Sequence, residues 1–224
     1  MTSKKNFLAT LSFKAIVLAV LFLACLLLFV YIADESVLEN ENAFDLQVMK
    51  WAAGHSSSTL IRIMSVVTFF GSSTFLLSTT LLLAGYYFFK RRWHYGIAIL
   101  LISASSSGIM FLLKQFFKRQ RPLHPYGRAL VNYSFPSGHS VSSFVFCSIL
   151  AYLVWQTHAS KKVRIAGVFL LMCCSLLIGL SRIFLNYHFA TDVIAGFCFS
   201  LAWVLLSFWV LRRYIRYSPP AKVL

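Results

Sequence analysis

The chain has 224 residues, of which 59% are apolar and only 12% are charged, and its net charge is +15. A soluble domain of this size is excluded, because uncharged runs long enough to cross a bilayer recur along the sequence. The Lys and Arg residues gather at the ends of these runs, where they act as topology signals, so we expect no nucleic-acid partner.

The apolar runs predict an all-α fold: a single membrane domain over residues 1–224, built as a bundle of six transmembrane helices. A short interfacial helix over residues 42–53 is expected after the first span, capped by Asn42 and bracing the bundle. Residues 114–138 and 182–189 are the expected active-site loops. The predicted spans are residues 15–32, 70–89, 93–113, 139–157, 165–181 and 190–211.

The positive charges predict how the bundle is oriented in the membrane. Basic clusters favour the cytoplasmic side, and four of them share one side if the N-terminus is cytoplasmic. We therefore expect a multi-pass protein of the cell inner (plasma) membrane with both termini in the cytoplasm and the two loops outside. The four clusters lie at Lys4, Lys5 and Lys14, at residues 90–92, at residues 161–164, and at Arg212, Arg213 and Arg216.

The stretch KQFFKRQRP, from Lys114 to Pro122, places positive charge on the outer side, against this bias. A bound anion would compensate for the cost. Lys114 and Arg121 are seven residues apart, so both can point the same way if the third helix continues outward until Pro122 ends it. Arg121 would grip two phosphoryl oxygens, with Lys114 as a point charge. The alternative for Lys114, Lys118 and Arg119 is a basic rim that contacts lipid headgroups.

The stretch PSGHS is typical of a helix start, here the start of the fourth span. Pro136 and Ser137 suit the first positions of a helix, and Gly138 lets the backbone approach a ligand closely. The free amides and the positive end of the helix dipole form a site for an anion. His139, in the first turn, would lie beside that anion.

The stretch SRIFLNYHFATD carries a histidine and a carboxylate four residues apart. His188 and Asp192 therefore share one helix face, where the carboxylate can hold one imidazole nitrogen and leave the other free to attack. Arg182 lies a short loop upstream and can share the same anion. The alternative for Asp192 is a carboxylate that caps the start of the sixth helix.

Together the blocks K-x6-RP, PSGH and SR-x5-H-x3-D, between Lys114 and Asp192, resemble the type 2 phosphatidic acid phosphatase family. The resemblance implies hydrolysis of phosphomonoesters or diphosphates through a phosphohistidine, without a metal ion or other cofactor. It implies that His188 is the nucleophile, that Asp192 orients it, and that His139 protonates the leaving oxygen and then activates water. The residues implied to hold the phosphoryl oxygens are Lys114, Arg121, Ser137, Gly138 and Arg182.

A lipid phosphate is the expected substrate, because its tails can stay in the bilayer while its phosphate enters the site; no obligatory protein partner is inferred. Undecaprenyl diphosphate, phosphatidylglycerol phosphate, phosphatidic acid and lipid A phosphate all fit this description. A phosphotransferase acting between lipids would use the same residues. A lipid flippase or transporter is the alternative from another class, although the predicted spans hold no acid in their cores.

Overall fold

The structure is a computed structural model that describes residues 2–38 and 43–217, and within these ranges it is helical with no strands. The all-α prediction is confirmed. The elements are α1 (Thr2–Ala33), the π-helical turn η1 (Asp34–Leu38), α2 (Ala43–Gly54), α3 (Ser58–Phe69), α4 (Ser73–Phe89), α5 (Trp93–Phe117), α6 (Gly138–Trp155), α7 (Lys161–Phe184) and α8 (Ala190–Tyr217).

Six segments of the described chain are long and apolar enough to cross a membrane, as the sequence predicts. Their outward side chains are apolar and exposed: Leu82 is 73% exposed, Leu112 65% and Phe169 70%. Apolar side chains facing outward on a helical bundle indicate contact with lipid. The protein is therefore a multi-pass membrane protein.

The second span is longer than residues 70–89, because helix α3 precedes it and both helices together form the span Ser58–Phe89. The hydroxyl oxygens of Ser57 and Ser72 each accept a backbone N–H bond and so start α3 and α4 as separate helices. Gly71 lies in the break between them, where a Cβ atom would come within 2.9 Å of the His139 ring. The break itself therefore lies against the start of α6, while α3 packs on α7.

The third span also differs from the sequence-based expectation. Helix α5 ends at Phe117, and Lys118 takes a left-handed conformation (φ 50°) that stops the helix before Pro122. Lys114 therefore lies in the last turn of α5, whereas Arg121 lies in the following loop, so the two do not share one helix face. Arg182 likewise lies in the last turn of α7, inside the helix.

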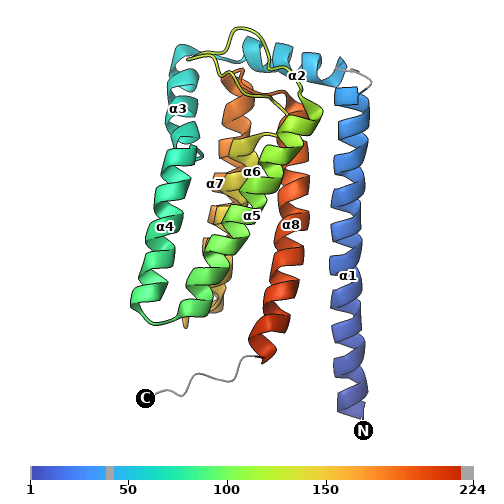
Figure 1. Ribbon diagram of the computed structural model, residues 1–224. Coiled ribbons are helices and arrows are strands. Elements are labelled where there is room, and N and C mark those ends of the chain that lie inside the picture. The colour runs from blue at the N-terminus through green and yellow to red at the C-terminus, as the bar shows by residue number, and fades with distance from the viewer. Residues whose placement is uncertain (1, 39–42, 218–224) are drawn as a thin grey trace.

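Helix α6 lies at the centre of the bundle and packs against α4, α5, α7 and α8, while α1 packs on α8 at the edge (Figure 1). Gly196 of α8 allows the close approach of α6, because a Cβ atom there would lie 3.0 Å from the Ser140 Cβ and 3.1 Å from the Ser137 carbonyl oxygen. The starts of α6 and α8 are held together at this point, and both carry predicted site residues.

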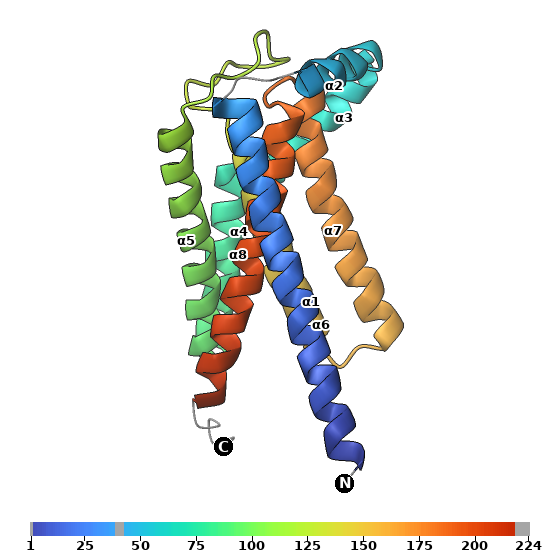
Figure 2. The same cartoon turned by 90° about the vertical axis from the view of Figure 1, so that its right-hand side faces the viewer.

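The two ends of the bundle differ. Helix α1 begins and α8 ends at one end, whereas α2 and the connection between α5 and α6 lie at the other end (Figures 1 and 2). All the predicted site residues lie toward this second end, which we call the loop end. The interfacial helix predicted over residues 42–53 is α2, while the cap Asn42 lies outside the described residues.

Candidate active site

The centre of the site is His188, which lies in the turn between α7 and α8 and is 2% exposed. Its Nδ1 lies 3.2 Å from Oδ2 of Asp192, which is fully buried in the first turn of α8. The same oxygen accepts hydrogen bonds from the Ser134 hydroxyl and from the Phe189 N–H at 3.0 Å. Asp192 therefore contacts the histidine ring and also caps the start of α8. The two roles that the sequence offers as alternatives for this carboxylate are both present.

The other ring nitrogen of His188, Nε2, lies 3.1 Å from Nη1 of Arg121. A guanidinium can only donate hydrogen bonds, so Nε2 must be the nitrogen with the free electron pair. The ring proton is thereby assigned to Nδ1, which faces Asp192. This is the tautomer that a nucleophilic histidine requires, with its lone pair directed at a cation and its N–H directed at a carboxylate.

The protonation state of His188 agrees with this assignment. Burial lowers the pKa of His188 from 6.5 to about 3, and the positive charges of Arg121 and Lys114 add to this effect against the opposing pull of Asp192. The imidazole is consequently neutral at physiological pH.

Arg121 is held in place by backbone oxygens of two loops. Its Nη1 donates to the Tyr187 carbonyl at 2.7 Å and its Nε to the Asn132 carbonyl at 2.8 Å, while Nη2 donates to the Asn132 side chain at 2.8 Å. Burial lowers the pKa of Arg121 below the ordinary value of an arginine, although the guanidinium remains charged at neutral pH. A fixed positive charge thus lies directly beside Nε2 of His188.

Arg182 contributes a second buried cation, with only 3% of its surface exposed. Its Nη1 donates to the Thr68 hydroxyl at 2.7 Å, and its guanidinium lies 4.1 Å from the centre of the Tyr187 ring. Its Nε is buried and has no hydrogen-bond partner in the described part of the chain. A buried N–H without an acceptor is costly, and a phosphoryl oxygen would satisfy it.

The PSGH block lies where the sequence predicts, at the start of α6. The Ser137 N–H donates to the Asp192 carbonyl at 3.0 Å, which ties this block to the histidine–carboxylate pair. The Ser137 hydroxyl is used as a helix cap and accepts bonds from Ser140. His139, in the first turn, interacts electrostatically with the rest of the site, namely with Arg182, His188, Arg121 and Lys114.

Lys114 lies close to the same charged groups, and two of its three ammonium donors bind backbone oxygens. Its Nζ donates to the carbonyl oxygens of Tyr133 at 2.8 Å and Ser134 at 3.0 Å. These bonds fasten the loop that carries Ser134, the serine that donates to Asp192. Lys114 thus supports the site through the loop and adds positive charge to it.

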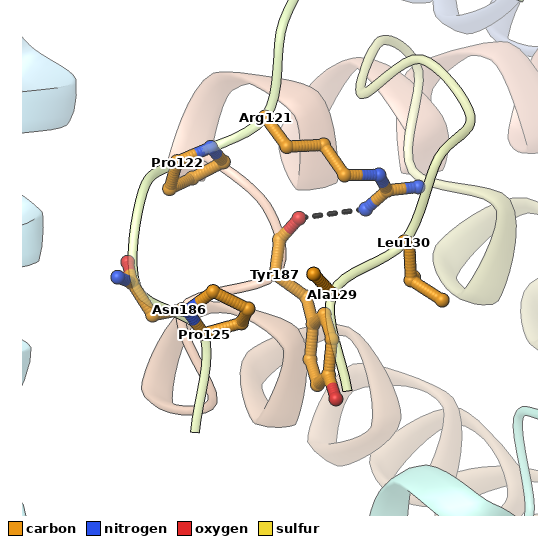
Figure 3. A pocket seen from close by; sticks show the side chains of 7 residues that line it. All are labelled: Arg121, Pro122, Pro125, Ala129, Leu130, Asn186 and Tyr187. Carbon is orange, nitrogen blue, oxygen red and sulfur yellow. Dashed lines mark hydrogen bonds between the residues drawn. The ribbon is translucent and has the colours of Figure 1, made fainter. Parts of the chain in front are cut away.

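A cavity opens beside Arg121, between the connection from α5 to α6 and the turn from α7 to α8 (Figure 3). Tyr187 lies along it with its carbonyl oxygen directed at Arg121. The remaining lining is mostly apolar or uncharged, from Pro122, Pro125, Ala129, Leu130 and Asn186.

Several residues of the site escape sequence reasoning. The sequence leaves open that Arg119 contacts lipid headgroups. Instead, its side chain is buried and forms ion pairs with Asp45 and Asp192, each at 2.7 Å. Asp45, expected in a bracing surface helix, is fully buried. Its partner is 74 positions away in sequence, so no local spacing could reveal the contact. Thr68, Asn132 and Ser134 are likewise revealed only by the fold.

The fold and the site define a multi-pass membrane protein in which a buried histidine–carboxylate pair faces a group of cations. A family model described as the PAP2 superfamily matches residues 95–216, which is more than half of the chain. The chain therefore belongs to the PAP2 superfamily, as the three sequence blocks predict.

Two kinds of relative have sequence similarity to the chain. Phosphatidylglycerophosphatase B of Bacillus subtilis is 31% identical over 112 residues, which cover 47% of this chain and 53% of that protein. Lipid A 1-phosphatase of Rhizobium johnstonii is 29% identical over 127 residues, which cover 52% of this chain and 48% of that protein. The chain thus spans about half the length of the relatives it matches.

Solved structures extend the likeness over most of the chain. The transmembrane PAP2-type phosphatidylglycerolphosphate phosphatase of Bacillus subtilis has a TM-score of 0.76 at 26% identity, covering 90% of this chain and 98% of that one. LpxE of Aquifex aeolicus has a TM-score of 0.56 at 21% identity, covering 75% of this chain and 96% of that one, and supports the fold alone.

Proposed function

We propose that this protein is a membrane phosphatase that hydrolyses phosphomonoesters or diphosphates of lipids through a phosphohistidine. The observation that carries the proposal is the geometry of His188: its unprotonated Nε2 lies 3.1 Å from Arg121, and its Nδ1 lies 3.2 Å from the buried carboxylate of Asp192. The names of the relatives, phosphatidylglycerophosphatase B and lipid A 1-phosphatase, support the same class of reaction.

In the first step, Nε2 of His188 attacks phosphorus and forms a P–N bond while the bond from phosphorus to the lipid oxygen breaks. His139 donates a proton to the departing oxygen. Asp192 stabilises the positive imidazole that results. In the second step, His139 removes a proton from water, the water oxygen attacks phosphorus, the P–N bond breaks, and inorganic phosphate leaves with His188 regenerated.

The charge on the phosphoryl oxygens is balanced by groups of the protein. Arg121 and the Arg182 Nε, which has no other partner in the described chain, supply fixed donors, and Lys114 supplies a further positive charge. Gly138 supplies a backbone N–H at the start of α6, whereas the predicted donor Ser137 has its own N–H bonded to the Asp192 carbonyl. We infer that these groups take the place of a metal ion, so phosphate release should persist in EDTA.

The site is proposed to face the outside of the inner (plasma) membrane, with both chain termini in the cytoplasm. The loop end of the bundle lies opposite the start of α1 (Figure 1). At the other end, the basic cluster at residues 90–92 connects α4 to α5, and the cluster at residues 161–164 forms the first turn of α7. A lipid in the outer leaflet would then keep its tails beside the exposed apolar faces of the spans while its phosphate reaches Arg121.

The test is to trap the phosphoenzyme with a ³²P-labelled lipid phosphate, quenched in alkaline SDS to preserve a phosphohistidine. We expect label on the wild-type protein, with EDTA present or absent, and none on His188→Asn. The matched control is His124→Asn, an exposed loop histidine whose φ of 57° suits asparagine. Phosphate release that survives in His188→Asn would refute the nucleophile assignment.

The same experiment, run with a panel of substrates, addresses specificity. Undecaprenyl diphosphate, phosphatidylglycerol phosphate, phosphatidic acid and lipid A phosphate are compared by their rates of phosphate release. Because phosphotransfer to a second lipid would use the same intermediate, phosphorylated lipid products are measured beside inorganic phosphate. Hydrolysis predicts that inorganic phosphate accounts for the label that leaves the protein.

A further inference from the structure

Next to His188 and Asp192 lie two further buried charged side chains, Arg119 and Asp45, that the proposed reaction steps do not use. The guanidinium of Arg119 lies between two carboxylates: Nη1 donates to Oδ1 of Asp192 and Nη2 to Oδ2 of Asp45, both at 2.7 Å. Both carboxylates are fully buried, and the Arg119 side chain is 8% exposed. Charges buried this deeply persist only when they are paired and hydrogen-bonded.

Two neighbours complete this cluster. The hydroxyl of Thr191 donates to Asp45 and accepts from Nη1 of Arg119 at 2.8 Å, while its backbone N–H donates to Oδ1 of Asp45 at 2.9 Å. The guanidinium also lies 4.3 Å from the centre of the Phe189 ring. Arg119 is thus fixed from the side of α2, from the start of α8 and from the turn that carries His188.

The two oxygens of Asp192 accept hydrogen bonds from different partners. Oδ1 is held by Arg119, and Oδ2 is left for Nδ1 of His188 and the Ser134 hydroxyl. If Arg119 were removed, the carboxylate could rotate and the imidazole would lose the acceptor that selects its tautomer. Asp45 acts one step further away, because it holds the guanidinium from the opposite side.

A lysine could not replace this arginine. The two carboxylates are reached by two different guanidinium nitrogens at once, which a planar fork can do from a fixed position. A lysine ammonium is a single point on a flexible stem, so it would favour one carboxylate and leave the other without its cation.

We propose that Arg119 and Asp45 are positioning residues for the nucleophile, so that α2, in the segment between the first two spans, is a working part of the active site. This inference rests on the proposed function, since it assigns the pair a role in presenting His188. It predicts that the pair acts on turnover and not on substrate affinity.

The test uses Arg119→Lys and Asp45→Asn, with Arg128→Lys as the matched control because Arg128 lies exposed in the same connection between α5 and α6. We expect kcat to fall roughly 10- to 100-fold in Arg119→Lys and by a smaller factor in Asp45→Asn, because each variant loses a side chain that orients the His188–Asp192 pair. KM should stay within about threefold. Arg128→Lys should match the wild type in both constants.

A second readout requires no substrate. In ¹⁵N-histidine NMR spectra, the His188 ring should show the Nδ1–H tautomer in the wild type and a mixture of tautomers in Arg119→Lys and Asp45→Asn. If the wild type shows no phosphatase activity, the proposed function fails while this readout still tests the pair. An unchanged His188 tautomer in folded variants overturns the inference, whether or not kcat falls. If Arg119→Lys does not fold, the tautomer in Asp45→Asn alone tests the inference.

Discussion

Replacing Asp192 with Asn should cripple turnover while leaving the shape of the site nearly unchanged. An Asn side chain has one oxygen and one NH₂ group, whereas both oxygens of Asp192 face groups that only donate. Oδ1 faces Nη1 of Arg119 at 2.7 Å, and Oδ2 faces the Phe189 N–H at 3.0 Å. In either orientation the new NH₂ group therefore points at a donor, and in both orientations His188 loses the negative charge that stabilises its imidazolium form.

The size of the effect follows from the distance between the carboxylate and the ring. A full positive charge on His188, 3.2 Å from Asp192, is stabilised by about 5 kcal/mol at an effective dielectric constant of about 20. In the transition state only part of that charge has developed, and half of it gives about 2.6 kcal/mol. Because about 1.4 kcal/mol corresponds to a tenfold change in rate, kcat should fall by roughly 10²- to 10⁴-fold.

The assay measures kcat and KM for one lipid phosphate with protein in detergent micelles, together with the melting temperature. KM should stay within a few-fold, because Asp192 is shielded from the phosphate by His188. The matched control is Asp34→Asn, an exposed carboxylate at the same end of the bundle, which should match the wild type. A kcat of Asp192→Asn within tenfold of wild type, at an unchanged melting temperature, would contradict the orienting role of this carboxylate.

Three further predictions concern the surroundings of the site. Gly71→Ala should lower the melting temperature and kcat together, because the added Cβ would clash with the Ile178 side chain and come within 2.9 Å of the His139 ring. Gly85→Ala meets nothing within 4 Å and should leave both unchanged. The His188 imidazole should remain neutral from pH 8 down to pH 5 in ¹⁵N NMR spectra, because its pKa is lowered to about 3; titration near pH 6.5 would show that the ring is not buried as described. A cysteine in place of Leu123, which is 78% exposed in the loop after α5, should react with an impermeant thiol reagent in intact cells; labelling only after lysis would reverse the proposed orientation.

The parts of the site that sequence reasoning found are those whose geometry is local. His188 and Asp192 are four residues apart, and the pair forms as the spacing predicts, although His188 lies in the turn just before α8 and only Asp192 lies in the helix. Ser137 caps α6 because capping depends on the few residues around a helix start. The seven-residue spacing of Lys114 and Arg121 wrongly predicts a shared helix face, because α5 ends before Lys118 and Arg121 reaches His188 from a loop.

The sequence by itself determined the class of protein: the apolar runs require six helices in a bilayer, and the three polar blocks at their ends predict a histidine site at one end of the bundle. Only the tertiary structure decided which charges meet. Arg119 joins Asp45 and Asp192 across more than seventy residues of sequence, and Thr68 of α3 reaches Arg182 of α7. Hydropathy and helical spacing are properties of one segment of the chain. The pairing of buried charges depends on how separate helices pack, because each buried charged side chain needs a partner that a neighbouring helix or loop supplies.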